Sequence, residues 1–368
     1  MKFSIAVNME RYEPGRDMRE AAAEALALVR LADRGGFEIA WAAEHHTIEL
    51  TVAPNPFLIL SHWAAHTRRI RLGTAVVVAP YWHPIRLAGE AALFDLLSGG
   101  RLEFGIARGA FQYEFDRMAG GIEQQKGVAY LKEMLPALKA LWQGDYEHRG
   151  ELWSFPKATS VPKPLQKPHP PIWVAARDPG TFEWAVESGA NIMATPLSRP
   201  HSEVAVLGQR FATTLANYPG RPRPRFLMLR RTCVYERPED GRVPIEASIK
   251  YGRHFETLFR NIGGVVNGFP EPADFEQLTN RSDYQPAAIR DSMVFGTPAE
   301  VVAKLREYEA AGVDQFCYGA SFGLPSAIAQ RSLELFIGEV MPQFADEPKG
   351  VKAAPAVAPQ RPPRAAGS

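Results

Sequence analysis

The chain has 368 residues, more than one typical domain needs but within reach of a single α/β barrel of roughly 250 residues with insertions. Hydrophobic residues make up 46% and charged residues 23%, which excludes a largely disordered chain, a collagen and a disulfide scaffold. Lys and Arg number 42 and Asp and Glu 41, so the net charge is +1 and we expect neither nucleic acid nor a membrane surface as a partner.

Short apolar runs alternate with longer amphipathic runs along the chain. Strands are predicted over residues 3–9, 37–46, 70–80, 101–109, 171–176, 191–196, 225–236 and 314–319. Helices are predicted between them over 21–36, 56–67, 84–100, 122–142, 297–312 and 325–340, with one more opening at Asp178-Pro179. This alternation predicts the α/β class, and eight units favour a closed (β/α)8 TIM barrel. The alternative is a doubly wound open sheet, although no GxGxxG follows the first strand.

Two stretches interrupt the repeat, one after the fourth unit and one after the seventh. Residues 144–170 are rich in turns and Pro, and residues 238–296 are predicted to hold short helices and loops that form a lid or pocket wall. The barrel is predicted as a single domain over residues 1–345. Residues 346–368 form a Pro/Ala/Arg-rich tail, which we expect to be disordered because it cannot bury enough apolar surface.

The cysteines and the N-terminus predict a cytoplasmic protein. Cys233 and Cys317 lie in apolar runs, which favours buried thiols over a disulfide. The chain begins with a strand-like stretch followed by charges, which is not the pattern of a secretory leader. No uncharged apolar window reaches the length that a bilayer span requires.

Functional side chains in such a barrel lie at the carboxyl ends of the strands. The second predicted strand ends in Glu44-His45-His46, where successive side chains face opposite sides and the two histidines cannot share one metal ion. No HExxH or Cys/His spacing occurs elsewhere, so we expect no metal site. His45 could exchange a proton with a ligand or merely bond to the backbone, and its position leaves both open.

Arginines end the fourth and fifth predicted strands. Arg108 has the planar fork that suits a phosphate, with a surface ion pair as the alternative. Arg177 precedes a helix N-terminus, where free N–H groups and the Thr181 hydroxyl also suit an anion. Asp178 is interpreted as the helix N-cap, turned away from the anion. Arg108, Arg177 and Thr181 are therefore predicted to form one phosphate cradle.

Two further features have competing interpretations. The basic run over residues 221–231 lacks interleaved aromatic residues, which favours a solvated strand start over a nucleic-acid contact. Aromatic residues near strand ends could line an apolar pocket, and core packing explains them equally well. They are Trp41, Tyr81, Trp82, Phe111 and Tyr113.

Several long segments resemble the luciferase-like flavin monooxygenases, with the nearest likeness to the α chain of bacterial luciferase. They are GFEIAWAAEHH, LGTAVVVAPYWHPIRLAGEAALFDLLSGGRLEFGIARGAFQYEF, FGTPAEVVAKLREYEAAGVDQFC and LFIGEVMP. The resemblance implies a two-component, FMN-dependent monooxygenase. A separate flavin reductase would supply reduced FMN as a co-substrate, which would react with dioxygen to oxygenate a small organic substrate.

The resemblance also implies roles for particular residues. It places the catalytic histidine at His45, beside Glu44, and a non-prolyl cis peptide under the flavin ring at Ala75-Val76. The phosphate arginine falls on Arg108 and the phosphate hydroxyl on Thr181.

The remaining expectations concern the rest of the cofactor site, the substrate and the assembly. Ala176 and Arg177 are expected to complete the cofactor site, and Phe111 and Tyr81 to contact the substrate. The Ala-rich helices at 56–66 and 86–97 are expected to form a homodimer.

Departures from the luciferase pattern leave other functions open. Ala107 stands where bacterial luciferase has a cysteine, and Arg177-Asp178 stands for Glu-Ser in its phosphate turn. The first difference argues against light emission and an aldehyde substrate. The alternatives are a deazaflavin-dependent hydride-transfer oxidoreductase and a non-catalytic flavin-binding partner subunit, against which the presence of both His45 and Arg108 argues.

Overall fold

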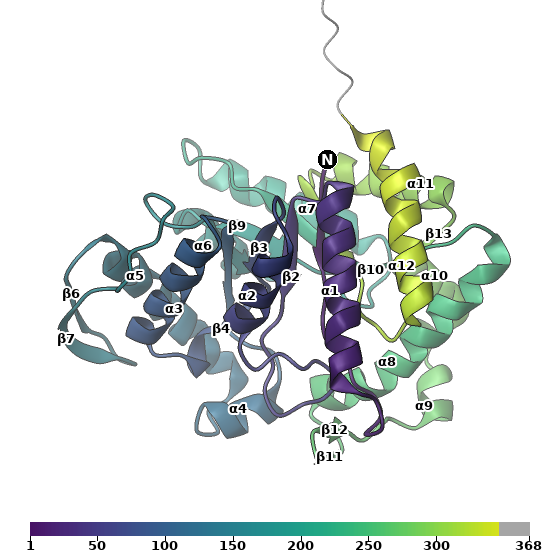
Figure 1. Cartoon of the computed structure of the whole chain (residues 1–368), viewed down its shortest axis with the longest axis horizontal. Coiled ribbons are helices and arrows are strands. Elements are labelled where there is room, and N and C mark those ends of the chain that lie inside the picture. Colours follow the sequence, from purple (N-terminus) through teal and green to yellow (C-terminus); the bar gives the residue numbers. More distant parts are fainter. Residues whose placement is uncertain (346–368) are drawn as a thin grey trace, which may run out of the picture.

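Eight parallel strand positions close on themselves in the computed structural model, which describes residues 1–345 (Figure 1). Each strand pairs in parallel with the next, and the last pairs with the first. In barrel order they are β1 (Lys2–Ala6), β2 (Ile39–Ala42), β3 (Arg71–Thr74) with β4 (Val77–Val78), β5 (Leu102–Ala107), β8 (Ile172–Ala175), β9 (Asn191–Ala194), β10 (Phe226–Val234) and β14 (Gln315–Gly319). The predicted (β/α)8 barrel is confirmed, and closure rules out the open sheet. The predicted tail, residues 346–368, lies outside the described residues.

Helices surround the barrel at the expected places. They are α1 (Met18–Gly35), α2 (Pro56–His66), α3 (Pro84–Leu97), α5 (Gly127–Gln143), α6 (Pro179–Glu187), α7 (Glu203–Asn217), α11 (Pro298–Ala310) and α12 (Ser326–Leu335). Local sequence explains their ends: Thr297 and Glu300 form a capping box at α11, and Gly36 ends α1 at φ 86°. Helix α7 was not among the sequence-based expectations.

Alternate strand residues build two separate cores. Outward-facing residues such as Phe104 and Ile106 pack under the helices, whereas Trp41 and Trp173 pack inside the barrel. A Cβ on Gly73 would lie 2.2 Å from the Trp41 ring, so glycine there leaves the space that this indole fills. Both cysteines are free and buried, as predicted.

Both insertions form additional elements on the barrel. The first contains the hairpin of β6 (Tyr146–Arg149) and β7 (Ser154–Ala158). The second contains α8 (Arg242–Arg260), β11 (Val265–Val266), β12 (Phe269–Pro270), α9 (Phe275–Thr279), α10 (Pro286–Ser292) and β13 (Val294–Gly296), which pairs with the end of β10. Its main element, α8, has 19 residues and is longer than the short helices expected there.

Several elements of the second insertion gather at one end of the barrel. Figure 1 shows α8, α9, β11 and β12 at the lower end, together with α4 (Gln112–Met118), while the N-terminus lies at the upper end. Because β1 starts near the N-terminus, the lower end carries the carboxyl ends of the strands. Within residues 1–345, no helix is both long and apolar enough to cross a membrane.

Candidate active site

His45 lies just beyond β2, at the carboxyl end of the barrel, and its ring is held by a carboxylate from another element. Its Nδ1 is 3.2 Å from Glu114 Oε2, and Glu114 Oε1 also accepts a 2.6 Å hydrogen bond from the His46 backbone N–H. Glu114, on α4, is only 2% exposed. The sequence-based analysis missed Glu114, although an acidic residue inside the aromatic run FQYEF, directly after the fourth strand, was an available signal.

The contact with Glu114 sets the protonation of His45. Burial lowers the pKa of His45, but the charge and hydrogen bond of Glu114, together with the more distant Glu44, outweigh burial and raise it above its usual value. The other face of the imidazole stacks on Phe111, with centroids 5.1 Å apart. The ring is therefore oriented on two sides while its side chain stays 24% exposed.

Glu44 was expected to act beside the catalytic histidine, but its carboxylate is hydrogen-bonded to other groups. It is 2% exposed and accepts hydrogen bonds from Val78 N at 2.7 Å and from Trp82 Nε1 at 2.9 Å. His46 Nε2 lies 2.8 Å from its other oxygen. Three donors thus occupy the carboxylate, and it makes no contact with the His45 ring. Glu44 fastens the end of β2 to the turn after β4, so its geometry is that of a positioning residue.

The segment between β3 and β4 holds the residues expected under the flavin ring. The Ala75-Val76 peptide is cis, as the resemblance implied. Ala75 N donates to Ala42 O at 2.7 Å, which ties this segment to the end of β2 just before Glu44. Ala75 and Val76 are half-buried and pack against the residues inside the barrel.

Arg108 and Arg177 come together at the carboxyl ends of β5 and β8. They follow the paired strands β5 and β8, and loss of hydration together with repulsion from Arg108 and Arg199 lowers the pKa of Arg177. Within residues 1–345, neither Arg108 nor Arg177 makes an ion pair or donates a side-chain hydrogen bond. A Cβ on Gly127 would lie 2.2 Å from Arg108 O, so this glycine lets the start of α5 pack directly on the arginine backbone.

Thr181 and Ala176, the other two residues expected in this part of the cofactor site, have hydrogen-bond partners of their own. Asp178 is the N-cap of α6, as predicted, and it accepts from both Thr181 N at 2.9 Å and Thr181 Oγ1 at 2.7 Å. The Thr181 hydroxyl would have to leave Asp178 before it could donate to a phosphate. Ala176 is 4% exposed in the core outside the barrel, and its N–H donates to Met193 O. Ala176 therefore offers an anion no free donor.

The two residues expected to contact the substrate lie in an aromatic wall. Phe111 packs between His45 and Phe255 of α8, with a centroid distance of 6.1 Å to Phe255. Tyr81 contacts the His46 and Phe115 rings, both at 5.5 Å, and its buried hydroxyl has no hydrogen-bond partner among the described residues. Phe111 thus contacts the His45 ring, whereas Tyr81 contacts the His46 ring.

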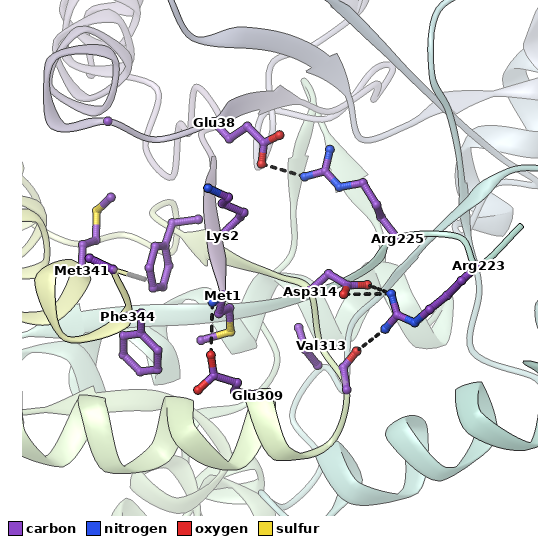
Figure 2. A pocket seen from close by; sticks show the side chains of 14 residues that line it. Met1, Lys2, Glu38, Arg223, Arg225, Glu309, Val313, Asp314, Met341 and Phe344 are labelled. Atoms are coloured by element: carbon purple, nitrogen blue, oxygen red, sulfur yellow. Dashed lines mark hydrogen bonds and ion pairs between the residues drawn. The ribbon is translucent and has the colours of Figure 1, made fainter. Parts of the chain in front are cut away.

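A cavity of about 640 Å³ lies at the opposite end of the barrel (Figure 2). Its charged residues, apart from Lys2, pair with one another. The pairs are Arg225 with Glu38 at 2.7 Å, Arg223 with Asp314 at 2.7 Å, and the Met1 amino group with Glu309 at 3.1 Å. These residues stand at the start of strands, the end that supports barrel stability rather than catalysis. We therefore locate the candidate active site at the His45 end.

Comparisons with known proteins identify the family of the chain. The family model described as luciferase-like monooxygenase matches residues 1–315. A curated relative from Acinetobacter baylyi, the flavin-dependent trigonelline monooxygenase, oxygenase component, is 42% identical over 94% of this chain and 96% of its own length. The crystal structure of monooxygenase RslO1 from Streptomyces bottropensis has a TM-score of 0.78 and 26% identity, covering 94% of this chain and 100% of that one.

An F420-dependent secondary alcohol dehydrogenase shares the fold alone. Its structure has a TM-score of 0.73 with 17% identity, covering 94% of this chain and 99% of that one. The same barrel architecture therefore occurs with a deazaflavin cofactor, and the residues of the site must decide between the two chemistries.

Replacing Glu114 with Gln should lower the pKa of His45. The amide keeps the shape but removes the charge that opposes burial, so the pKa should fall below its usual value of about 6.5. Histidine-selective NMR titration measures this directly. Asp116→Asn is the matched control, because it removes a charge from an exposed position of the same helix.

The same exchange predicts how the loss of stability depends on pH. A raised folded-state pKa stabilises the fold below the unfolded pKa, and this contribution disappears as pH rises through the folded pKa. Glu114→Gln should therefore lower the melting temperature more at about pH 6 than at about pH 9. An equal loss at both values would contradict the ion pair between Glu114 and His45.

Proposed function

The chain belongs to the luciferase-like monooxygenase family, and on that basis we propose that it is the oxygenase component of a two-component enzyme using reduced FMN and dioxygen. The observation that carries the proposal is the shared location of an oriented histidine and an unpaired arginine cluster at the carboxyl end of the barrel. The 42% identity to an oxygenase component supports the same division of labour, with a separate reductase supplying reduced flavin.

The arginine cluster fits the phosphate of FMN. Arg108 and Arg177 repel each other and have no carboxylate partner within residues 1–345, so a dianion between them would remove the repulsion. Planar guanidinium forks suit phosphate oxygens, and the start of α6 adds a positive dipole end. We assign Arg108 and Arg177 to the phosphate and the Ala75-Val76 segment to the ring.

The residues of the site have different roles in the proposed reaction. Reduced FMN, when bound, supplies the electrons with which dioxygen is activated. His45 holds or donates a proton on the side facing the reacting atoms, and Glu114 raises the pKa of its ring and holds it in one orientation. Phe111 and α8 keep water from the site, which protects reactive oxygen from unproductive decay. The substrate is a small organic molecule, and trigonelline is the first compound to test.

An exposed apolar face supports the proposed homodimer. Leucines on α2 and α3 are uncovered, with Leu58 73% and Leu97 70% exposed. The loop carrying Val161, which is 80% exposed, packs beside α3 at Gly89. Exposed apolar side chains on these neighbouring helices suit an interaction site, and we propose that a second copy of the chain buries them.

Mixing anaerobic protein carrying reduced FMN with oxygenated buffer tests the proposed chemistry. We expect oxidised flavin to return more slowly than it does in free solution, because the site excludes water. His45→Ala should still bind FMN but consume oxygen without oxygenating trigonelline, releasing hydrogen peroxide. Oxidised flavin returning at the free-solution rate in the native protein would count against the proposal and support the deazaflavin alternative.

Arg108→Gln and Arg177→Gln test the phosphate site. Each should weaken FMN binding by about 30-fold, the size expected for one charged hydrogen-bonding partner. Riboflavin, which lacks the phosphate, should bind all variants equally well. Arg117→Gln removes an exposed charge from α4 and serves as the control. Equal losses for FMN and riboflavin would show that the arginines shape the site rather than bind phosphate.

Leu58→Asp combined with Leu97→Asp tests the dimer. Two buried, unpaired carboxylates in a closed interface should convert the protein to monomers in sedimentation analysis. Ile328→Asp is the control, because Ile328 is exposed on α12 and its exchange adds a charge away from the α2–α3 face. Leu324→Asp would not serve, since Leu324 packs against the core. A native protein that already sediments as a monomer overturns this assignment.

A further inference from the structure

Arg231 ends the inward-facing row of β10 at the carboxyl end of the barrel. Leu227 and Leu229 on the same strand pack among the residues inside the barrel. Because strand residues alternate, Arg231 faces inward and Arg230 faces outward. Arg230 confirms the alternation, since it bonds the backbone oxygens of Leu197 and Arg199 outside the barrel. Arg231 is thus an inward cation above an apolar row.

Arg231 has no carboxylate ion-pair partner in the part of the chain that the structure describes. Its polar neighbour is Tyr251, whose pKa burial raises, although the charge and hydrogen bond of Arg231 lower it. A guanidinium has five N–H donors, so beyond the contact with Tyr251 this half-buried group keeps donors for the acceptors of a ligand. Its neighbour Arg230, by comparison, is held by three backbone oxygens.

Aromatic rings connect Arg231 to the candidate catalytic histidine. The guanidinium carbon lies 3.9 Å from the Tyr251 centroid and 6.0 Å from that of Phe255. Tyr251 and Phe255 stack at 5.5 Å on one face of α8, and Phe255 meets Phe111, which stacks on His45. The wall therefore begins at a cation without a carboxylate ion pair and ends at the histidine.

The strands beside Arg231 carry almost no side chain at its level. Arg231 pairs with Gly319, and Gly319 pairs with Ala6. A Cβ on Gly319 would come within 2.8 Å of Arg230 O, so no larger residue fits there. Trp41 follows at this level, opposite Ala6, and its buried Nε1 also has no acceptor among the described residues. The Arg231 guanidinium and the unpartnered Trp41 N–H thus lie around small residues in the barrel interior.

We propose that Arg231 binds the carboxylate of a small aromatic substrate whose ring packs against the wall of Tyr251, Phe255 and Phe111. This inference rests on the proposed function and names its substrate class. Guanidinium and carboxylate match as planar, bidentate partners, and flat rings pack favourably on aromatic walls. The flavin phosphate already has Arg108 and Arg177, at the ends of β5 and β8 rather than of β10.

One acidic side chain competes for the charge of Arg231. Glu10 follows β1 and accepts a 2.9 Å hydrogen bond from Gly323 N. Burial raises the pKa of Glu10 to about 7, even though this hydrogen bond and the charges of Arg231 and Arg16 lower it. A carboxyl group that is substantially protonated at neutral pH leaves the Arg231 cation available to a ligand.

Matched pairs of ligands test the assignment by calorimetric titration of the FMN-loaded protein. The pairs are trigonelline with N-methylnicotinamide, nicotinate with nicotinamide, and benzoate with benzamide, each differing by carboxylate against amide. We expect at least one carboxylate to bind more tightly than its amide. Arg231→Met should weaken that carboxylate about 100-fold and leave the amide nearly unchanged. Arg231→Lys should fall between, because it keeps the charge and loses the fork.

Two controls separate this inference from simpler explanations. Lys250→Gln removes an exposed cation from α8, where Lys250 pairs with Glu13, and should leave both affinities unchanged. The affinity of each variant for reduced FMN is measured in parallel, with thermal unfolding to confirm that Arg231→Met is folded.

Three results would overturn the assignment. The first is a native protein without preference for any carboxylate. The second is an equal loss of carboxylate and amide binding in both Arg231 variants, which would mean packing alone. The third is weaker binding of reduced FMN with unchanged carboxylate binding, which would place Arg231 on the flavin. A failed oxygen reaction in the native protein, with the carboxylate preference intact, would instead refute the proposed monooxygenase.

Discussion

Closure of the parallel sheet is the constraint on which the rest of this structure depends. Eight strands in one circle leave no edge, so alternate residues must face a narrow interior and all carboxyl ends must meet on one rim. Glycines satisfy the first demand: a Cβ on Gly105 would lie 2.0 Å from Thr74 O, and one on Gly73 would strike Trp41. The second demand brings His45, Arg108 and Arg177 to the same end, although they are far apart in sequence.

The two ends of the barrel differ in how their charges are balanced. At the strand starts, arginines pair with carboxylates of neighbouring elements. They are Arg71 with Glu103, Arg225 with Glu38, and Arg223 with Asp314. At the strand ends, three arginines have no such partner within the described residues. They are Arg108, Arg177 and Arg231. Because unpaired cations near a low-dielectric interior are unfavourable, this asymmetry indicates that ligands complete one end and side chains complete the other.

The buried carboxylates at the active end have separate tasks. Glu44 is saturated by Val78, Trp82 and His46, so it positions the end of β2 rather than reacting. Glu114 divides its oxygens between the His46 backbone and the His45 ring, so it controls both the orientation and the charge of the imidazole. Helix α8 then covers the same end with Phe255 and Tyr251, which links the second insertion to the histidine through Phe111.

The sequence by itself determined the barrel, its eight strand positions, the buried thiols, and the residues that motif likeness marks, including His45, Arg108 and the cis Ala75-Val76 peptide. These follow from local periodicity and contiguous segments, which a linear chain displays directly. Contacts between distant segments decided the rest. Glu114 replaces Glu44 as the partner of His45, Asp178 engages Thr181, and Arg231 remains unpaired, because each outcome depends on which side chains converge after the sheet closes.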